Sequence, residues 1–404
     1  MLIVKNIDQI YNELHGFYPT AVVKTELVEL RQSAGRVLAE NICAGEDIPH
    51  FCRSTVDGWA VRAKDTFGAT DAFPAILKMA GEVEMGKKPL LEVTEDYAVY
   101  VPTGGWVPEG ADAVVMIEFC EKLGNELLVY KPVSPGTCIV FRADDTKEGA
   151  EVIPKGTVIG TKEIGTLAAL GKTKIPVLKK PLCGIISTGD EIVPADTPVD
   201  LNAAKMRDVN SYLASSLIKK WGGEAIFCGI VKDEEQALTE AVFKAYEEYD
   251  MVLLSGGSSA GMKDNSMKVI ESLPGSAFLT HGLAVKPGKP TILGRAGTKP
   301  VIGLPGHPVS AFFIMQAVVR SIFYNMLGIS VPAEPYLNAV TGEKIPSNNG
   351  RDDFIAGVLK DGIFTPVPVK SGLITLLAVS NGYVRIEKSS EGLDKGAPVK
   401  VFLY

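Results

Sequence analysis

The segment Met251–Ser266, MVLLSGGSSAGMKDNS, decides the fold class of the central part of the chain. It begins with a short apolar run, Met251–Leu254, and the sequence Ser255-Gly256-Gly257 then breaks that run. This pattern is typical of a buried parallel strand that ends in a glycine-rich turn. Because such turns let backbone N–H groups approach a ligand closely, the segment is a candidate site for phosphate or another oxyanion.

Asp264 follows this turn directly and has two interpretations. Its carboxylate could hold a divalent cation against bound phosphates, because hard cations prefer oxygen ligands. It could equally cap the helix that follows an ordinary strand-to-helix turn.

The flanking segments repeat the same alternation of strand and helix. Helical patterns occupy Asn210–Trp221, with Asn210 or Ser211 as N-cap, and Asp233–Tyr249, which opens with capping-box spacing. We expect strands at Leu182–Ile186, Ala225–Val231, Pro290–Leu293 and Pro300–Leu304. The alternation predicts a parallel sheet covered on both faces, with ligands at the carboxyl ends of its strands. The loops expected to meet there are Ser187–Glu191, Val231–Asp233, Ser255–Asp264 and Gly303–Ser310.

The loop Gly303–Ser310, GLPGHPVS, indicates an anion site. Pro308 suits the first turn of a helix that the apolar run Val309–Leu327 continues, and we expect free N–H groups near Val309 and Ser310. Two cations precede this loop in KPGKP, Lys286 and Lys289. They suit a tetrahedral oxyanion or a phosphate, although they could also be solvated surface charges.

The remaining segments frame this centre. We expect helices at Asn6–His15, Val23–Ala39 and Glu163–Leu170, and strands at Tyr97–Pro102 and Ala113–Glu118. Asp57-Gly58 is a turn in which a lone aspartate is more often structural than catalytic. From Ser330 onward, short strands and glycine turns indicate a small β-barrel or sandwich.

Composition limits the function. A net charge of −7 over 404 residues argues against broad nucleic-acid binding, which needs a basic surface. The six cysteines are scattered without metal-ligand spacing, which favours reduced thiols. With neither a signal peptide nor an apolar run of spanning length expected, we predict a cytoplasmic protein without membrane partners.

Seven motifs in order carry a family resemblance: STVDGWA, VPTGG, ISTGDEI, SGGSSAGMKD, KPGKP, GLPGHPVSA and RDDF. Together they resemble the MoeA-type molybdopterin molybdenumtransferases, to which the E domain of gephyrin is also similar. The resemblance implies a multidomain α/β plus β protein with a central doubly wound molybdopterin-binding α/β domain. The implied domains are an elongated linker domain (1–46 and 137–178), an inserted β-rich domain (47–136), the molybdopterin-binding domain (179–329) and a small C-terminal β-barrel (330–404).

The resemblance also implies a reaction. Adenylylated molybdopterin and molybdate, or tungstate, would react with a divalent cation, usually Mg²⁺, while the phosphoanhydride is cleaved and AMP leaves. The enzyme would be a homodimer whose active site is shared between subunits, with the molybdopterin adenylyltransferase as a possible partner.

Individual positions follow from the same resemblance. It implies catalytic roles for Asp57, Thr103, Glu191, Asp233 and Asp264, of which Glu191, Asp233 and Asp264 would hold the metal. It implies oxyanion binding by Lys286, Lys289, Pro290, Ser310, Arg351 and Ser371. It implies molybdopterin or nucleotide binding by Ser187, Thr188, Gly189, Ser255, Gly256, Gly257, Gly306 and Pro308. His307 stands where the family commonly has asparagine, either as a ligand contact or as a satisfied loop histidine.

Two other functions stay open at this stage. One is the adenylyltransferase that shares the central fold, against which the extra domains argue. The other is a non-catalytic molybdopterin-binding scaffold or carrier, against which the retained carboxylates and lysines argue. A nucleotide-binding dehydrogenase is excluded because no loop matches G-x-G-x-x-G or G-x-x-x-x-G-K-[ST].

Overall fold

The computed structural model describes residues 4–20, 24–198, 200, 202–256, 262–368 and 371–404, with the side chains of 262–264 outside the description. The chain forms two compact units. Unit 1 comprises Met1–Val28, Ser33–Ala39 and Pro176–Tyr404, and unit 2 comprises Glu29–Gln32 and Glu40–Ile175. Each unit has its own core.

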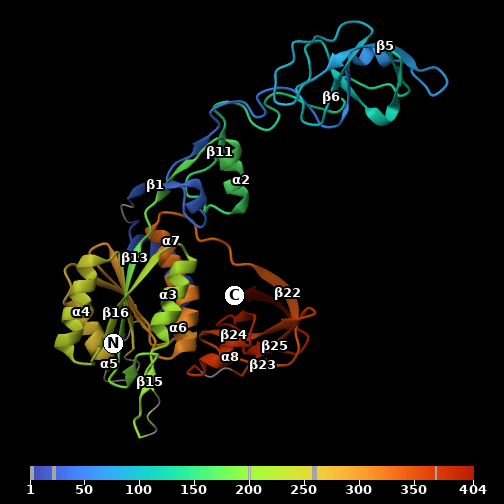
Figure 1. The fold of residues 1–404 in the computed structure, drawn as a ribbon. Helices are drawn as coiled ribbons and strands as arrows, with labels where there is room; N and C mark the ends of the chain where they lie inside the picture. Colours follow the sequence, from blue (N-terminus) through green and yellow to red (C-terminus); the bar gives the residue numbers. More distant parts are fainter. Residues whose placement is uncertain (1–3, 21–23, 199, 201, 257–261, 369–370) are drawn as a thin grey trace. The chain divides into compact units, whose positions relative to one another are not determined.

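A six-stranded sheet forms the centre of unit 1 (Figure 1). Its order is β16 (Glu224–Val231), β13 (Leu182–Thr188), β17 (Met251–Ser255), β21 (Lys299–Leu304), β20 (Ile292–Ala296) and β18 (Ser276–His281). The first four strands are parallel, as the sequence predicts. The expectation of a parallel sheet is wrong at β20, because the turn at Gly297 joins β20 to β21 too tightly for anything but antiparallel pairing. β18 pairs antiparallel with β20 and therefore runs in the same direction as the first four strands.

Helices cover both faces of this sheet. Residues of α1 (Ile7–Phe17), α3 (Asn210–Lys220), α6 (Pro308–Ile314) and α7 (Arg320–Met326) pack on one face, and residues of α4 (Glu235–Glu248) and α5 (Met262–Glu271) pack on the other. Figure 1 shows α3 with α6 and α4 with α5 on opposite sides of the strands. The doubly wound arrangement leaves the strand ends as the open edge of the domain.

The helix through α6 and α7 is continuous across a π-helical segment, Met315–Val319. Among the described residues, Pro308–Met326 is long and apolar enough to cross a membrane, which corrects the expectation that the chain holds no such run. Its most apolar window is 83% buried within the protein. Burial in the core explains its composition, since a core helix is apolar on most sides.

The C-terminal part of unit 1 is a closed barrel. The strands β24 (Asp352–Lys360), β25 (Ile363–Pro366), β22 (Tyr336–Thr341), β28 (Pro398–Leu403) and β26 (Gly382–Ile386) pair in that order, and β24 pairs with β26 to close the ring. β19 (Val285–Lys286) extends β24, while β23 (Ile345–Pro346) pairs with β27 (Gly392–Leu393). α8 (Ile374–Ala378) lies between β25 and β26 in the chain. The barrel predicted by the sequence is confirmed.

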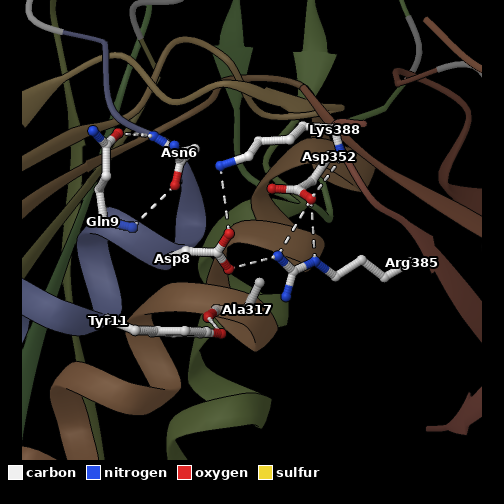
Figure 2. A network of polar contacts seen from close by, with 8 residues as sticks. All are labelled: Asn6, Asp8, Gln9, Tyr11, Ala317, Asp352, Arg385 and Lys388. Atoms are coloured by element: carbon white, nitrogen blue, oxygen red, sulfur yellow. Dashed lines mark hydrogen bonds and ion pairs between the residues drawn. The ribbon is translucent and has the colours of Figure 1, made fainter. Parts of the chain in front are cut away.

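A polar network ties α1 to the barrel (Figure 2). Arg385 contacts Asp8 at 3.2 Å and the buried Asp352 at 3.3 Å, and Lys388 contacts Asp8 at 3.5 Å. The helix itself begins at a capping box in which Asn6 and Gln9 each accept the other's backbone N–H. Arg385 therefore contacts one carboxylate of α1, Asp8, and one of β24, Asp352.

Unit 2 is built on a six-stranded sheet. Its order is β7 (Ala113–Met116), β4 (Gly58–Val61), β6 (Tyr97–Val101), β5 (Ala75–Glu82), β9 (Glu126–Val129) and β8 (Cys120–Leu123). Short pairs join β3 (Arg53–Ser54) to β10 (Ile139–Val140) and β2 (Ile42–Cys43) to β11 (Glu151–Ile153). α2 (Thr161–Ala169) is the helix predicted at Glu163–Leu170.

Local patterns misassign three features. The described part of Val23–Ala39 contains strand β1 (Thr25–Glu29) and a 3₁₀ turn instead of a helix, because pairing to the distant strand β12 (Lys174–Leu178) overrides its periodicity. Glu234, not Asp233, is the N-cap of α4, and no side chain bonds the helix start. Val209, not Asn210 or Ser211, is the N-cap of α3.

We expect Phe313→Ala to destabilise unit 1 by about 3–5 kcal/mol, because truncating a buried aromatic side chain leaves a cavity. Phe313 is 1% exposed, and its ring lies 5.4 Å from those of both Phe354 and Tyr383. The measurement is the urea midpoint followed by circular dichroism. Phe73→Ala is the control, since Phe73 is 79% exposed and its truncation is expected to leave the midpoint unchanged.

Candidate functional site

A cavity of about 830 Å³ lies where the loop after β19, the start of α6 and the barrel meet in unit 1. We call it the lysine cavity. All six residues that the sequence suggests for oxyanion binding line it: Lys286, Lys289, Pro290, Ser310, Arg351 and Ser371. They come from four separate segments, so the fold gathers them from across the chain.

A buried carboxylate organises two of the cations. β19 runs parallel to β24 with Lys286 opposite Asp353, whose side chain is 0% exposed. The Asp353 carboxylate lies 3.7 Å from Lys286 Nζ and 3.5 Å from Arg351 Nε, and it accepts a hydrogen bond from Ser347 at 2.9 Å. Neither cation contact is a close hydrogen bond, so Asp353 lowers the positive potential without occupying the donors that line the cavity.

The start of α6 is partly occupied. The Val309 N–H, expected to be free, donates to the Ser371 carbonyl at 3.1 Å, because the loop before α8 packs against this helix start. The Ser371 hydroxyl lies 3.0 Å from His307 Nδ1. His307 is thus held by Ser371 at the cavity wall.

A second cavity, of about 640 Å³, lies at the carboxyl ends of β13, β17 and β21. We call it the strand-end cavity. Seven of the residues suggested by the sequence line it: Ser187, Thr188, Glu191, Ser255, Gly256, Gly306 and Pro308. Gly189 is not among its lining residues, and Gly257 lies outside the described residues. His307 lines both cavities, which makes them neighbours across one loop.

Gly256 permits the close approach of two of these strands. Its φ is +138°, and a Cβ there would lie 1.9 Å from the Thr188 carbonyl oxygen. No other residue fits, because both the backbone conformation and the space require glycine.

Sequence reasoning missed four polar residues that line the strand-end cavity: Lys205, Arg207, Asp208 and Asn210. The carboxylate of Asp208 accepts from the Ser187 hydroxyl at 2.9 Å and from the Ser211 N–H at 3.2 Å. Asn210 donates to the carbonyls of Gly306 at 2.9 Å and Pro305 at 3.3 Å. The only sequence signal was polar residues immediately before a helix, which capping explains equally well.

Three acidic residues, Asp190, Glu191 and Asp233, lie around the end of β16, and we call them the acidic group. Burial raises the pKa of Asp233 above its ordinary value, a hydrogen bond with Asn265 opposes this, and the charges of Asp190 and Glu191 raise it further. The Asp233 N–H also donates to Asp190 at 3.4 Å. Among residues whose side chains are described, no group of three metal-ligating side chains gathers, and the side chain of Asp264 is outside that description.

The remaining suggested residues lie in unit 2. The exposed Asp57 accepts hydrogen bonds from the Thr103 N–H at 2.7 Å and the Thr103 hydroxyl at 3.1 Å. Asp57 directly precedes β4 and Thr103 follows β6, and these strands are antiparallel neighbours with Gly58 opposite Val101. Thr103 thus fixes the direction in which the carboxylate points.

A doubly wound domain with a cavity at the carboxyl ends of its parallel strands, followed by a closed barrel, defines a multidomain α/β plus β protein. Family models agree with this class over almost the whole chain. The MoeA N-terminal region (domain I and II) matches residues 5–171, the "Probable molybdopterin binding domain" matches 184–324, and the MoeA C-terminal region (domain IV) matches 338–404.

Individual relatives are similar over comparable lengths. The chain is 31% identical to a molybdopterin molybdenumtransferase of Bacillus subtilis, over 94% of this chain and 90% of the relative. It is 31% identical to one from Nostoc, over 84% and 79%. The crystal structure of a molybdopterin biosynthesis MoeA protein from Pyrococcus horikoshii matches with a TM-score of 0.88 and 34% identity, over 99% and 100% of the two chains. The chain belongs to the MoeA family.

Asp233→Asn is expected to raise the melting temperature at pH 7 in the absence of divalent cations. Because the folded-state pKa of Asp233 is raised, wild-type stability falls as pH increases from the ordinary value of 3.8 through the folded-state value. The increase in melting temperature of the variant over wild type should therefore be full at neutral pH and vanish below pH 3.8.

The measurement is a thermal melt in EDTA between pH 3 and pH 8. Asp196→Asn, at an exposed position of the same domain, is the matched control and should show no such pH dependence. A variant no more stable than wild type at pH 7 would show that Asp233 carries no electrostatic penalty.

Proposed function

We propose that the protein is a molybdopterin molybdenumtransferase, which inserts molybdate or tungstate into adenylylated molybdopterin and releases AMP. Relatives of that name support the reaction class. The observation that carries the proposal is the meeting of all six suggested oxyanion residues in the lysine cavity. A tetrahedral dianion needs cations and directional donors together, and this cavity offers both.

The lysine cavity would bind the oxyanion substrate. Lys286, Lys289 and Arg351 supply positive charge, while the hydroxyls of Ser310 and Ser371 supply directional hydrogen bonds. Lys344 and Glu343 also line the cavity, so four cations stand against two carboxylates, Glu343 and Asp353, and the difference of two charges balances a dianion. Catalysis would rest on positioning and electrostatic stabilisation without a covalent enzyme intermediate.

The strand-end cavity would bind adenylylated molybdopterin. Ser187, Thr188, Ser255 and Gly256 form its floor at the sheet edge, where α/β domains bind ligands. Because His307 and Pro308 separate it from the lysine cavity, a substrate seated there would reach the oxyanion across a single loop.

Mg²⁺ is the cation that we assign to the acidic group. Burial of Asp233 beside Asp190 and Glu191 disfavours its charged form, which is the electrostatic situation that a divalent cation relieves. Glu191 and Asp233 would hold the ion together with Asp264. When bound, the ion would neutralise phosphate charge during cleavage of the phosphoanhydride.

We further infer a cytoplasmic homodimer in which Asp57 and Thr103 contribute to the site of the opposite subunit. The hydrogen bonds that orient the exposed Asp57 support a role beyond an ordinary turn. The adenylyltransferase that makes the substrate would be the partner that hands it over.

AMP release from adenylylated molybdopterin tests the reaction. Wild type with Mg²⁺ should release AMP only when molybdate or tungstate is present, and Asp57→Ala should lose release while retaining the fold. Ligand that stays bound without AMP release under every condition would instead identify a scaffold or carrier. ATP-dependent adenylylation of bare molybdopterin would identify the adenylyltransferase.

Lys289→Ala is expected to raise the KM for molybdate by roughly 10- to 100-fold, because a hydrogen bond to a charged group contributes about 1.5–3 kcal/mol. The KM for adenylylated molybdopterin should change little, since Lys289 lines only the lysine cavity. Steady-state AMP release at varied molybdate measures both constants. Lys360→Ala, which removes an exposed lysine at the end of β24, is the matched control.

A further inference from the structure

His307 lies where the lysine cavity and the strand-end cavity adjoin, and it belongs to the lining of both. It is the N-cap residue of α6, but its side chain makes no capping hydrogen bond within the described chain. Its Nδ1 lies 3.0 Å from the hydroxyl oxygen of Ser371 instead. The imidazole is therefore paired with a residue of the proposed oxyanion site and not with the helix start.

The backbone of Ser371 is held against the same helix. Its carbonyl accepts the Val309 N–H at 3.1 Å. At the next residue, Gly372, a Cβ would lie 3.9 Å from Cδ2 of the imidazole. Because the loop packs against both the helix and the ring, the Ser371 hydroxyl stays within hydrogen-bond reach of Nδ1.

The hydrogen atom between these two side chains decides what Ser371 can offer to an anion. A hydroxyl has one hydrogen, and a neutral imidazole has one N–H. If Nδ1 accepts the hydrogen of Ser371, that hydrogen cannot bond an oxyanion. If Nδ1 carries the single N–H of a neutral ring, Ser371 is free to donate, but the ring adds no charge. Only the imidazolium ring both donates to the Ser371 oxygen and brings a positive charge to the cavity.

The electrostatic surroundings of His307 come from both cavities. The charged residues that line them are Lys286, Lys289, Glu343, Lys344 and Arg351 on one side and Glu191, Lys205, Arg207 and Asp208 on the other. Asp353 lies behind Lys286 and Arg351. A bound dianion adds two negative charges to this set, and a nearby negative charge favours the charged form of a histidine. Oxyanion binding therefore favours uptake of a proton by His307.

We propose that His307 is a positioning residue for the oxyanion. It takes up one proton from solvent when the oxyanion binds, and its Nδ1–H then leaves the Ser371 hydroxyl free to donate to the bound anion. The proposal rests on the proposed oxyanion site and adds a proton to what that site binds. By linkage, the affinity for the oxyanion must rise as the pH falls through the range in which histidine titrates.

Calorimetric titration of molybdate into the whole protein tests this without turnover. Molybdate remains a dianion between pH 6 and pH 8, so a change of affinity over this range belongs to the protein. Wild type should bind molybdate roughly 10-fold more tightly at pH 6 than at pH 8, as expected for a hydrogen bond to a charged group. At pH 7, titrations in two buffers of different ionisation enthalpy should show net uptake of a fraction of one proton.

His307→Asn keeps a polar group near the position of Nδ1 and removes the titratable ring. Asparagine is a favoured N-cap residue, so the fold should be retained. We expect the affinity of this variant to change by less than about 2-fold between pH 6 and pH 8, without proton uptake. His50→Asn, at an exposed position of unit 2, is the matched control and should keep the proton uptake of wild type.

Ser371→Ala separates an effect through the hydroxyl from the charge of the ring alone. Without the hydroxyl, a protonated ring has nothing to reorient. We therefore expect the pH dependence of molybdate affinity to shrink below about 3-fold, mainly through weaker binding at pH 6. Full pH dependence in Ser371→Ala would overturn the proposed action through Ser371.

Two further results would overturn the proposal and leave the proposed function standing. One is molybdate binding by wild type without proton uptake, and the other is pH dependence that persists in His307→Asn. Absence of AMP release with proton-linked molybdate binding intact would refute the proposed reaction alone. Absence of molybdate binding at both pH values would overturn the oxyanion site and this proposal together.

Discussion

The parallel pairing of β13, β17 and β21 is the constraint on which the site depends. Successive parallel strands end at the same edge, so their loops meet however far apart they lie in the sequence. The pairing is tight enough at Thr188 and Gly256 to leave no room for a Cβ. If this register shifted, Ser187, Thr188 and Ser255 would no longer share a cavity, and the start of α6 would separate from the strands.

The barrel contributes part of the lining of the lysine cavity. The two-residue strand β19 leaves the central domain and pairs with β24, which places Lys286 beside Asp353 and Arg351. The Asp8–Arg385–Asp352 network holds the first helix against the same barrel strand, and Asp352 precedes Asp353 directly. The lysine cavity therefore depends on contacts between segments from the beginning, middle and end of the chain.

Much of the fold was predictable from the sequence because it follows from local patterns. Apolar runs, glycine turns and Pro308 located the strands, the rim loops and the start of α6, and the six residues that the motifs suggest for oxyanion binding line one cavity. What could not be predicted depends on partners distant in the chain. β1 is a strand because of β12, the Val309 N–H is taken by Ser371, and Asn210 looked like a cap because sequence shows no carbonyls of Pro305 and Gly306.

Asp353 also affects how strongly the lysine cavity attracts dissolved anions when no substrate is bound. Without this buried anion, the four cations that line the cavity beside Glu343, namely Lys286, Lys289, Lys344 and Arg351, would attract chloride and other monovalent ions more strongly. A fixed negative charge behind them weakens attraction in proportion to ligand charge, so a dianion still gains twice what a monoanion gains. The carboxylate thus lowers the attraction of common monovalent anions and leaves the twofold electrostatic advantage of a dianion in place.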